Sequence, residues 1–259
     1  MRNLAILCLA LVTVGVVSSC KKMNPVTVTP TVDSLKVGLI AYYPFNNSGI
    51  DSTLRGNNAT ITGGIASTTN RFGTANAAYH FDGTTGYLVV KDNNDLRLSN
   101  TDFTLNTWVD LEGYNTSYGD EVLCKRGTGS TNGWNYGITG VLDQNNGFTL
   151  GVTSYQVSGG TDPLALGVKV ITLNQWHMLT TVYSFSKKQL SYYIDGVLDK
   201  TAINIPSPAS TTTADLYIGQ DSQTAGNTAY YVKGKLDDIR IYNRVISIAQ
   251  IQKLYSLPY

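Results

Sequence analysis

Residues 103–111 read Phe-Thr-Leu-Asn-Thr-Trp-Val-Asp-Leu, and this stretch decides the class of fold. Successive side chains of an extended chain point to opposite sides. One side of this stretch therefore carries Phe103, Leu105, Thr107, Val109 and Leu111. A period of two with apolar residues on one side predicts a β-strand with a buried face.

Similar short apolar segments recur along the chain, and turn residues separate them. The segment 190–194 ends at Asp195-Gly196, which indicates a tight hairpin because a type I′ turn needs a positive φ at both central positions. Many short strands without intervening helices indicate a sandwich or a barrel. The expected strands are 39–45, 77–81, 87–90, 103–111, 122–124, 136–141, 148–152, 176–183, 190–194, 216–218 and 230–242.

The composition agrees with an all-β protein. Gly, Ser, Thr, Asn and Tyr are abundant, whereas glutamate occurs only at Glu112 and Glu121. Such a composition disfavours helices. The formal net charge of +1 leaves no basic footprint for nucleic acid, so no nucleic-acid partner is expected.

One short helix is expected near the C-terminus. Ser247 and Gln250 have the spacing of a capping box, in which each side chain satisfies a backbone N–H at the helix start. Ile248, Ile251 and Leu254 then mark one apolar face. We expect this face to pack on the sandwich.

The N-terminus has the pattern of a secretory signal peptide. Arg2 precedes the apolar run 4–17, and the small residues Ser18 and Ser19 stand before Cys20. The run is shorter than the ~20 residues that a membrane-spanning helix needs. The sequence Val-Ser-Ser-Cys at 17–20 resembles a bacterial lipobox. The resemblance implies that Cys20 carries a lipid and holds the protein in the bacterial cell envelope, at the outer membrane. The alternative is an ordinary signal peptide that leaves Cys20 free.

These observations predict three parts: a signal peptide (1–19), an extended linker that begins with lipidated Cys20 (20–36), and one domain (37–259). Pro25 and Pro30 favour an extended linker. Cys124 lies in an apolar stretch, where a thiol behaves as a small buried hydrophobe. We therefore expect no disulfides.

Several motifs in order resemble the laminin G-like branch of the concanavalin A-like lectin/glucanase superfamily. They are Ala-Tyr-Tyr-Pro-Phe at 41–45, Arg-Phe-Gly at 71–73, Tyr-His-Phe-Asp-Gly at 79–83, and Gly-Lys-Leu-Asp-Asp-Ile-Arg-Ile-Tyr-Asn-Arg at 234–244. The resemblance spans about residues 37–257. It implies a two-sheet antiparallel jelly-roll sandwich with the chain ends close together. It also implies a lectin-like function.

Catalysis is not expected. Glycosidases need two carboxylates that face one bond, and the superfamily's glucanases carry closely spaced acidic residues on one strand. Here Glu112 and Glu121 stand nine positions apart, with a loop between them. His80 and His177 lie in strand-like segments with no partner for nucleophilic catalysis nearby in the sequence. We therefore assign no catalytic residue.

Calcium is a possible structural cofactor, because related laminin G-like domains often hold this ion. Asp51 lies in a turn, and Asp237 has the strand parity of Ile239 and Ile241. A buried carboxylate needs a partner, which Ca²⁺ would supply. Asp238 is expected to face solvent. In the alternative interpretation, Asp237 accepts backbone N–H groups and binds no metal.

A glycan site is predicted near the loop 113–120. This loop offers Tyr114, Tyr118 and Asp120, and Trp134 and Tyr136 are candidates to join them. In the alternative interpretation these aromatic rings are packing residues.

The predicted function is noncatalytic binding of a carbohydrate or surface polymer by a membrane-anchored, lectin-like domain. The alternatives are an adhesion or structural module that binds protein, and a divergent polysaccharide-degrading enzyme. Exposed aromatic rings beside polar side chains in a concavity would favour carbohydrate binding. Convergent carboxylates would favour the enzyme.

Overall fold

The computed structural model describes residues 33–127, 132–158, 164–221 and 230–258. Every described residue belongs to one compact unit, Asp33–Tyr259. The predicted signal peptide, Cys20 and most of the predicted linker lie outside the described residues. Within the described part, no helix is long and apolar enough to cross a membrane.

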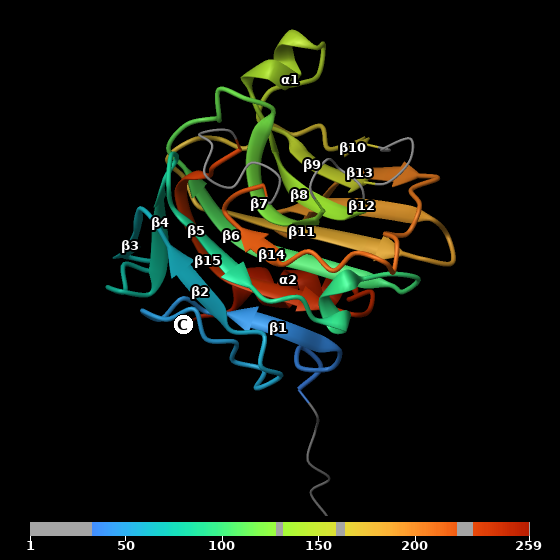
Figure 1. The fold of residues 1–259 in the computed structure, drawn as a ribbon, viewed down its shortest axis with the longest axis horizontal. Helices are drawn as coiled ribbons and strands as arrows, with labels where there is room; N and C mark the ends of the chain where they lie inside the picture. Colours follow the sequence, from blue (N-terminus) through green and yellow to red (C-terminus); the bar gives the residue numbers. More distant parts are fainter. Residues whose placement is uncertain (1–32, 128–131, 159–163, 222–229, 259) are drawn as a thin grey trace, which may run out of the picture. The chain divides into compact units, whose positions relative to one another are not determined.

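Two antiparallel sheets form a sandwich (Figure 1). The first sheet has the order β13-β12-β11-β6-β15-β4-β3, and β1 also pairs with β15. Its strands are β1 (Leu39–Tyr43), β3 (Ile65–Thr68), β4 (Ala78–Asp82), β6 (Phe103–Leu111), β11 (His177–Ser184), β12 (Gln189–Ile194), β13 (Val197–Ile203) and β15 (Lys233–Tyr242).

The second sheet has the order β10-β9-β8-β7-β14-β5-β2. It packs over the first sheet and confirms the predicted jelly-roll type of sandwich. Its strands are β2 (Ala59–Thr62), β5 (Tyr87–Val90), β7 (Gly119–Arg126), β8 (Gly133–Thr139), β9 (Thr153–Ser158), β10 (Leu164–Leu166) and β14 (Leu216–Ile218).

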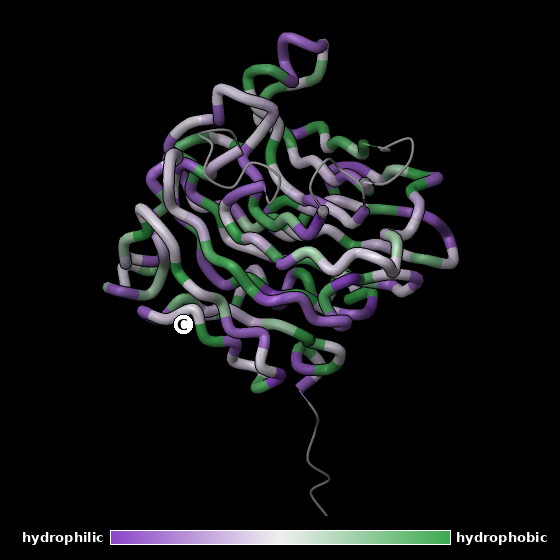
Figure 2. The backbone as a smooth tube through the Cα atoms, in the orientation of Figure 1, coloured by the Kyte–Doolittle hydropathy of each residue, from purple (hydrophilic) through white to green (hydrophobic). Residues whose placement is uncertain are grey.

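The alternating stretch in β6 lies at the centre of the first sheet, between β11 and β15. Phe103, Leu105, Val109 and Leu111 are fully buried in the main core. In Figure 2, hydrophobic and hydrophilic positions alternate along the strands, as a buried face requires. β1 pairs with β15, so the first and last strands lie side by side as predicted.

The hairpin between β12 and β13 also forms as predicted. Asp195 and Gly196 have φ of 54° and 79°, both in the left-handed region that a type I′ turn requires.

The C-terminal helix α2 (Ile248–Ser256) covers the outer face of the first sheet. Its capping box is present: the Gln250 N–H donates to the Ser247 hydroxyl at 3.3 Å, and the Ser247 N–H donates to the Gln250 side chain at 2.9 Å. Ile251 and Leu254 are buried in a second apolar cluster with Trp108. This cluster gives the first sheet apolar contacts on both faces.

One expected strand is wrong. Residues 148–152 form no strand, because the chain first makes the short helix α1 (Val141–Asn145) and a turn that places Gly147 at φ 89°. The N–H groups of Val141 and Leu142 donate to loop carbonyls rather than to a neighbouring strand. The strand β9 therefore begins only at Thr153.

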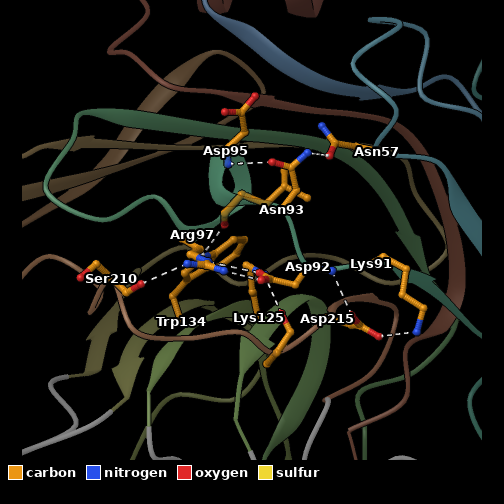
Figure 3. Close-up of polar contacts among 12 residues, drawn as sticks. Asn57, Lys91, Asp92, Asn93, Asp95, Arg97, Lys125, Trp134, Ser210 and Asp215 are labelled. Atoms are coloured by element: carbon orange, nitrogen blue, oxygen red, sulfur yellow. Dashed lines mark hydrogen bonds and ion pairs between the residues drawn. The ribbon is translucent and has the colours of Figure 1, made fainter.

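A polar cluster forms beside the 3₁₀ helix η1 (Asn94–Arg97), at one end of the second sheet (Figure 3). Lys125 of β7 is fully buried, and its ammonium donates at 2.6 Å both to Asp92 and to the Ala214 carbonyl. Arg97 also pairs with Asp92 at 2.5 Å. The hydrogen bond from Arg97, followed by that from Lys125, lowers the pKa of Asp92. The cluster gives a buried lysine the paired anion that it needs.

Candidate ligand-binding site

A hollow of about 370 Å³ lies on the outer face of the second sheet, where β7, β8 and β9 run side by side. Trp134 and Tyr136 of β8 point into the core, so Asn135 between them points outward. The hollow is lined by Tyr118, Glu121, Arg126, Asn135, Asp143, Asn146, Phe148, Ser154, Gln156, Leu164, Asp221 and Tyr230.

A bulge in β7 places the charged residues of the hollow on one face. The register between β7 and β8 shifts between Glu121 and Leu123. As a result, the consecutive residues Val122 and Leu123 both enter the core. Glu121 and Arg126, five positions apart, then both line the hollow instead of falling on opposite faces.

Aromatic and aliphatic side chains line part of the hollow. The rings of Tyr118 and Tyr230 stack with centroids 6.1 Å apart and an interplanar angle of 19°. Tyr118 is 47% exposed, and Phe148 and Leu164 are exposed as well. Exposed tyrosine faces of this kind offer apolar area with a polar tip, which suits a ligand that is partly apolar and partly hydroxylated.

An ion pair lines another part of the hollow. The Arg126 guanidinium donates through Nε to Asp221 at 3.1 Å, through Nη2 to the other oxygen of Asp221, and through Nη1 to Gln156 at 3.2 Å. The Cys124 thiol donates to Asp221 at 3.3 Å. Each of the three guanidinium nitrogens of Arg126 thereby donates a hydrogen bond, which fixes the orientation of this side chain.

Glu121 is the unusual group of the hollow. Its Oε1 accepts a hydrogen bond from Asn135 Nδ2 at 2.8 Å, while Glu121 Oε2 and Asn135 Oδ1 have no partner within the described part of the chain. Burial raises the pKa of Glu121 to about 8, and the carboxylates of Asp221 and Asp143 add to the rise against the opposing effect of Arg126. Glu121 is thus a neutral acid at pH 7.

Of the five predicted ligand residues, Tyr118 lines the hollow and the other four do not. Tyr114 is half-buried and donates its hydroxyl to the Ile171 carbonyl at 2.5 Å. Asp120 is fully buried and accepts the backbone N–H groups of Asn115 and Lys233, at 2.9 and 3.3 Å. Burial raises the pKa of Asp120 to about 7. Tyr114 and Asp120 therefore hold the loop in place, and their assignment to ligand binding is corrected.

Trp134 and Tyr136 are likewise corrected. Both are fully buried in the main core, and the Trp134 indole donates to the Leu96 carbonyl at 3.2 Å. Their strand parity puts them on the face opposite the hollow, so they support its floor from below.

The predicted calcium residue Asp51 is buried and well supplied with donors. Its carboxylate accepts the N–H groups of Tyr42, Thr53 and Asn57 at 3.0, 2.9 and 3.3 Å, and the Thr53 hydroxyl as well. The carboxylate therefore closes the turn after β1.

Asp237 lies on the other face from the one expected. A register shift between Asp237 and Arg240, with Asp238 at φ 54°, breaks the parity, so Asp237 stands opposite Trp108 on the outer face of the first sheet. Asp238 is buried rather than solvent-facing. Arg71 binds both carboxylates, Asp237 at 3.1 Å and Asp238 at 2.9 Å.

The residues present do not fit a calcium ion between Asp51 and Asp237. Arg71 already supplies the positive partner of Asp237, and the donors of Asp51 are backbone amides. Over the described residues, no three or more His, Cys, Asp or Glu side chains form a group that could hold a metal ion. Calcium binding stays a prediction without geometric support.

A second polar array lies outside the hollow. Thr172 Oγ1 stands 2.6 Å from His177 Nε2, and His177 Nδ1 stands 2.8 Å from Asp195. The order hydroxyl–imidazole–carboxylate is that of a nucleophile with its base. Asp195 also accepts the Met178 N–H at 2.9 Å, so the array fastens the β12–β13 turn to the start of β11. None of its three residues lines the hollow.

Most of the hollow's residues were not predicted as ligand residues, and Arg126, Asp143, Ser154, Gln156, Asp221 and Tyr230 are among them. A usable signal was present for some of them. If Tyr136 points inward, Asn135 must point outward, and the same alternation places Ser154 and Gln156 outward on either side of Tyr155. The bulge that aligns Glu121 with Arg126 has no such signal.

The two sheets and the hollow on an outer face define a lectin-like β-sandwich. The chain belongs to the concanavalin A-like lectin/glucanases superfamily, whose laminin G-like family model matches residues 82–252. Among proteins of curated function, no sequence matches this chain.

Solved structures share the fold. Domain 4 of AbnA, a GH43 extracellular arabinanase from Geobacillus stearothermophilus, in complex with arabinotriose, is 22% identical, with a TM-score of 0.64 over 84% of this chain and 98% of that one. The binding domain of botulinum neurotoxin DC in complex with SialylT is 14% identical, with a TM-score of 0.64 over 87% of this chain. The binding domain of Paraclostridial Mosquitocidal Protein 1 is 15% identical, with a TM-score of 0.62 over 85% of this chain. This chain spans about half of each toxin domain.

Proposed function

We propose that the protein binds carbohydrate without cleaving it, through the hollow on the second sheet, and is held in the bacterial cell envelope by a lipid on Cys20. The observation that carries the proposal is the stacked pair Tyr118 and Tyr230 beside a polar floor in one concavity. Sugar rings present apolar faces and hydroxyl edges, and this combination of groups matches both.

The structural neighbours support the same class of ligand. The AbnA domain was solved with arabinotriose, and a toxin binding domain with SialylT. These ligands belong to those proteins, and their sequence identities to this chain are low. They indicate that sandwiches of this fold present sugar sites.

A glycan array probed with the full chain tests the proposal, with Tyr118→Ala as the variant. Truncating a contact tyrosine at a binding site costs about 1–2 kcal/mol, so we expect about tenfold weaker binding. Phe185→Ala is the matched control, because Phe185 is an exposed aromatic residue outside the hollow. Equal binding by wild type and Tyr118→Ala would place the sugar elsewhere, and binding of no glycan would reject the proposal.

A hydrolase is the second candidate, because Glu121, Asp143 and Asp221 all line the hollow. A protonated carboxyl such as Glu121 is a suitable general acid. Asp221, however, is bound at both oxygens by Arg126, which leaves it poorly placed as a nucleophile. Incubation with polysaccharides and assay of new reducing ends separates the two functions, and we expect none to appear.

A further inference from the structure

The hollow carries more negative than positive groups. Its described lining has the carboxylates of Asp143 and Asp221, the neutral carboxyl group of Glu121, and one guanidinium, Arg126. Arg126 is bound to Asp221 and Gln156. A ligand with its own carboxylate would therefore meet repulsion and no uncommitted cation within the described lining.

The two unpartnered atoms of the hollow define what a ligand must offer. Glu121 Oε1 accepts from Asn135, so the proton of the neutral acid belongs on Oε2. Glu121 Oε2 is then a hydrogen-bond donor and the unpartnered Asn135 Oδ1 an acceptor; both atoms are buried, and both side chains line the hollow. Sugar hydroxyls both accept and donate, so they satisfy both atoms, whereas an unsatisfied buried polar atom costs free energy.

We infer that the hollow selects uncharged saccharides over acidic ones, and that Glu121 contacts the bound sugar as a neutral carboxylic acid. The inference rests on the proposed function and specifies its ligand class.

The groups around Glu121 support the neutral form. Arg126 comes from the same strand and is paired with Asp221, which follows β14. Asp143 of α1 approaches from the rim. Burial raises the pKa of Asp143 as well, and burial followed by the charge of Asp221 raises the pKa of Tyr230 to about 12. Tyr118 is a further titratable group of the lining, and Cys124 lies close by through its contact with Asp221.

Paired oligosaccharides test the selectivity. The probes are arabinotriose, galactotriose and lactose as neutral sugars, and trigalacturonic acid and sialyllactose as acidic counterparts of the last two. Calorimetry with the full chain at pH 7 should give at least about tenfold tighter binding of the neutral member of a pair. Equal or tighter binding of the acidic member overturns the inference and leaves the proposed function intact. Binding of none of the five overturns both.

The pH dependence tests the role of Glu121. With its pKa at about 8, roughly one-tenth of Glu121 keeps its proton at pH 9. Wild-type affinity for the tightest neutral probe should therefore fall about tenfold between pH 6.5 and pH 9, a range in which sugar hydroxyls do not titrate.

Two variants and one control distinguish the titration of Glu121 from that of its neighbours. Glu121→Gln keeps an N–H donor that cannot ionise, so its affinity should not change with pH and should exceed that of wild type at pH 9. Glu121→Ala should bind more weakly than wild type at pH 6.5. Glu112→Gln, the chain's other glutamate and outside the hollow, should keep the wild-type profile. If Glu121→Gln keeps the wild-type slope, another group such as Cys124 titrates, and the role of Glu121 is rejected.

Discussion

At the scale of single residues, burial changes the protonation state of a carboxyl group. Glu121 is 6% exposed and has one hydrogen bond from Asn135, which does not replace the hydration that its charge would lose. It is therefore neutral at pH 7, unlike the lysine Lys125, whose burial is matched by the carboxylate of Asp92. The difference lies in the partner: the cation nearest to Glu121 is already paired with Asp221.

The raised pKa of Glu121 predicts how stability changes with pH. The ordinary glutamate pKa is about 4.3, so between about pH 4.3 and pH 8 the folded protein holds a proton that the unfolded chain releases. The free energy of unfolding therefore falls as pH rises through this range, by up to about 1.4 kcal/mol per pH unit. Glu121→Gln removes this contribution.

Urea denaturation at pH 5.5 and pH 7.5 measures the effect. The difference in unfolding free energy between wild type and Glu121→Gln should shift by about 2 kcal/mol, with wild type losing more stability at pH 7.5. The control Glu112→Gln disrupts only a half-exposed pair with His80 and should shift by less than about 1 kcal/mol. A shift of the same small size in both variants would mean that Glu121 ionises normally.

At the scale of elements, irregularities in the strands decide where polar groups go. The bulge in β7 brings Glu121 and Arg126 to one face, and the register shift in β15 turns Asp237 and Asp238 toward Arg71. Arg71 lies between β3 and β4, and its guanidinium also stacks over the Trp108 ring at 4.3 Å. Arg71 thus connects its own loop to the central strand β6 and to the last strand β15.

Arg71→Met should weaken this junction strongly. The change leaves two buried carboxylates without their shared cation, and breaking a buried pair from one side costs about 3–5 kcal/mol. Lys235→Met is the control, because the Lys235–Asp110 pair is partly exposed and should cost about 1 kcal/mol or less. Urea denaturation gives both values.

Melting in calcium and in chelator distinguishes the role of the arginine from that of calcium. Because Arg71 occupies the position of a positive partner beside Asp237, we expect the wild-type melting temperature to be equal in millimolar calcium and in chelator. If calcium instead raises the melting temperature of wild type, and Asp237→Asn removes the rise, the ion binds at Asp237 after all.

At the scale of the whole molecule, the fold was predictable and the site was not. The alternation in β6, the hairpin at Asp195 and the capping box at Ser247 are local signals, and each formed as expected. The short strands β2, β3 and β10 carry too few residues to show a period. The hollow depends on the bulge in β7 and on Asp221, which lies about a hundred positions from Glu121, and no local pattern encodes either.

The proposed membrane attachment concerns the whole chain, and it gives the last prediction. The apolar run 4–17 ends in two serines before Cys20, and this arrangement resembles the site where a lipid is added. Replacing Cys20 by alanine removes the thiol that would carry the lipid. In a bacterial host, we expect the Cys20→Ala protein to leave the membrane fraction or to keep its signal peptide, and to lose incorporation of labelled fatty acid. Cys8→Ala is the matched control, because Cys8 lies inside the apolar run and would be removed with it. If Cys20→Ala fractionates, migrates and labels like wild type, the lipid is not on Cys20, and the hollow must reach its glycan without this anchor.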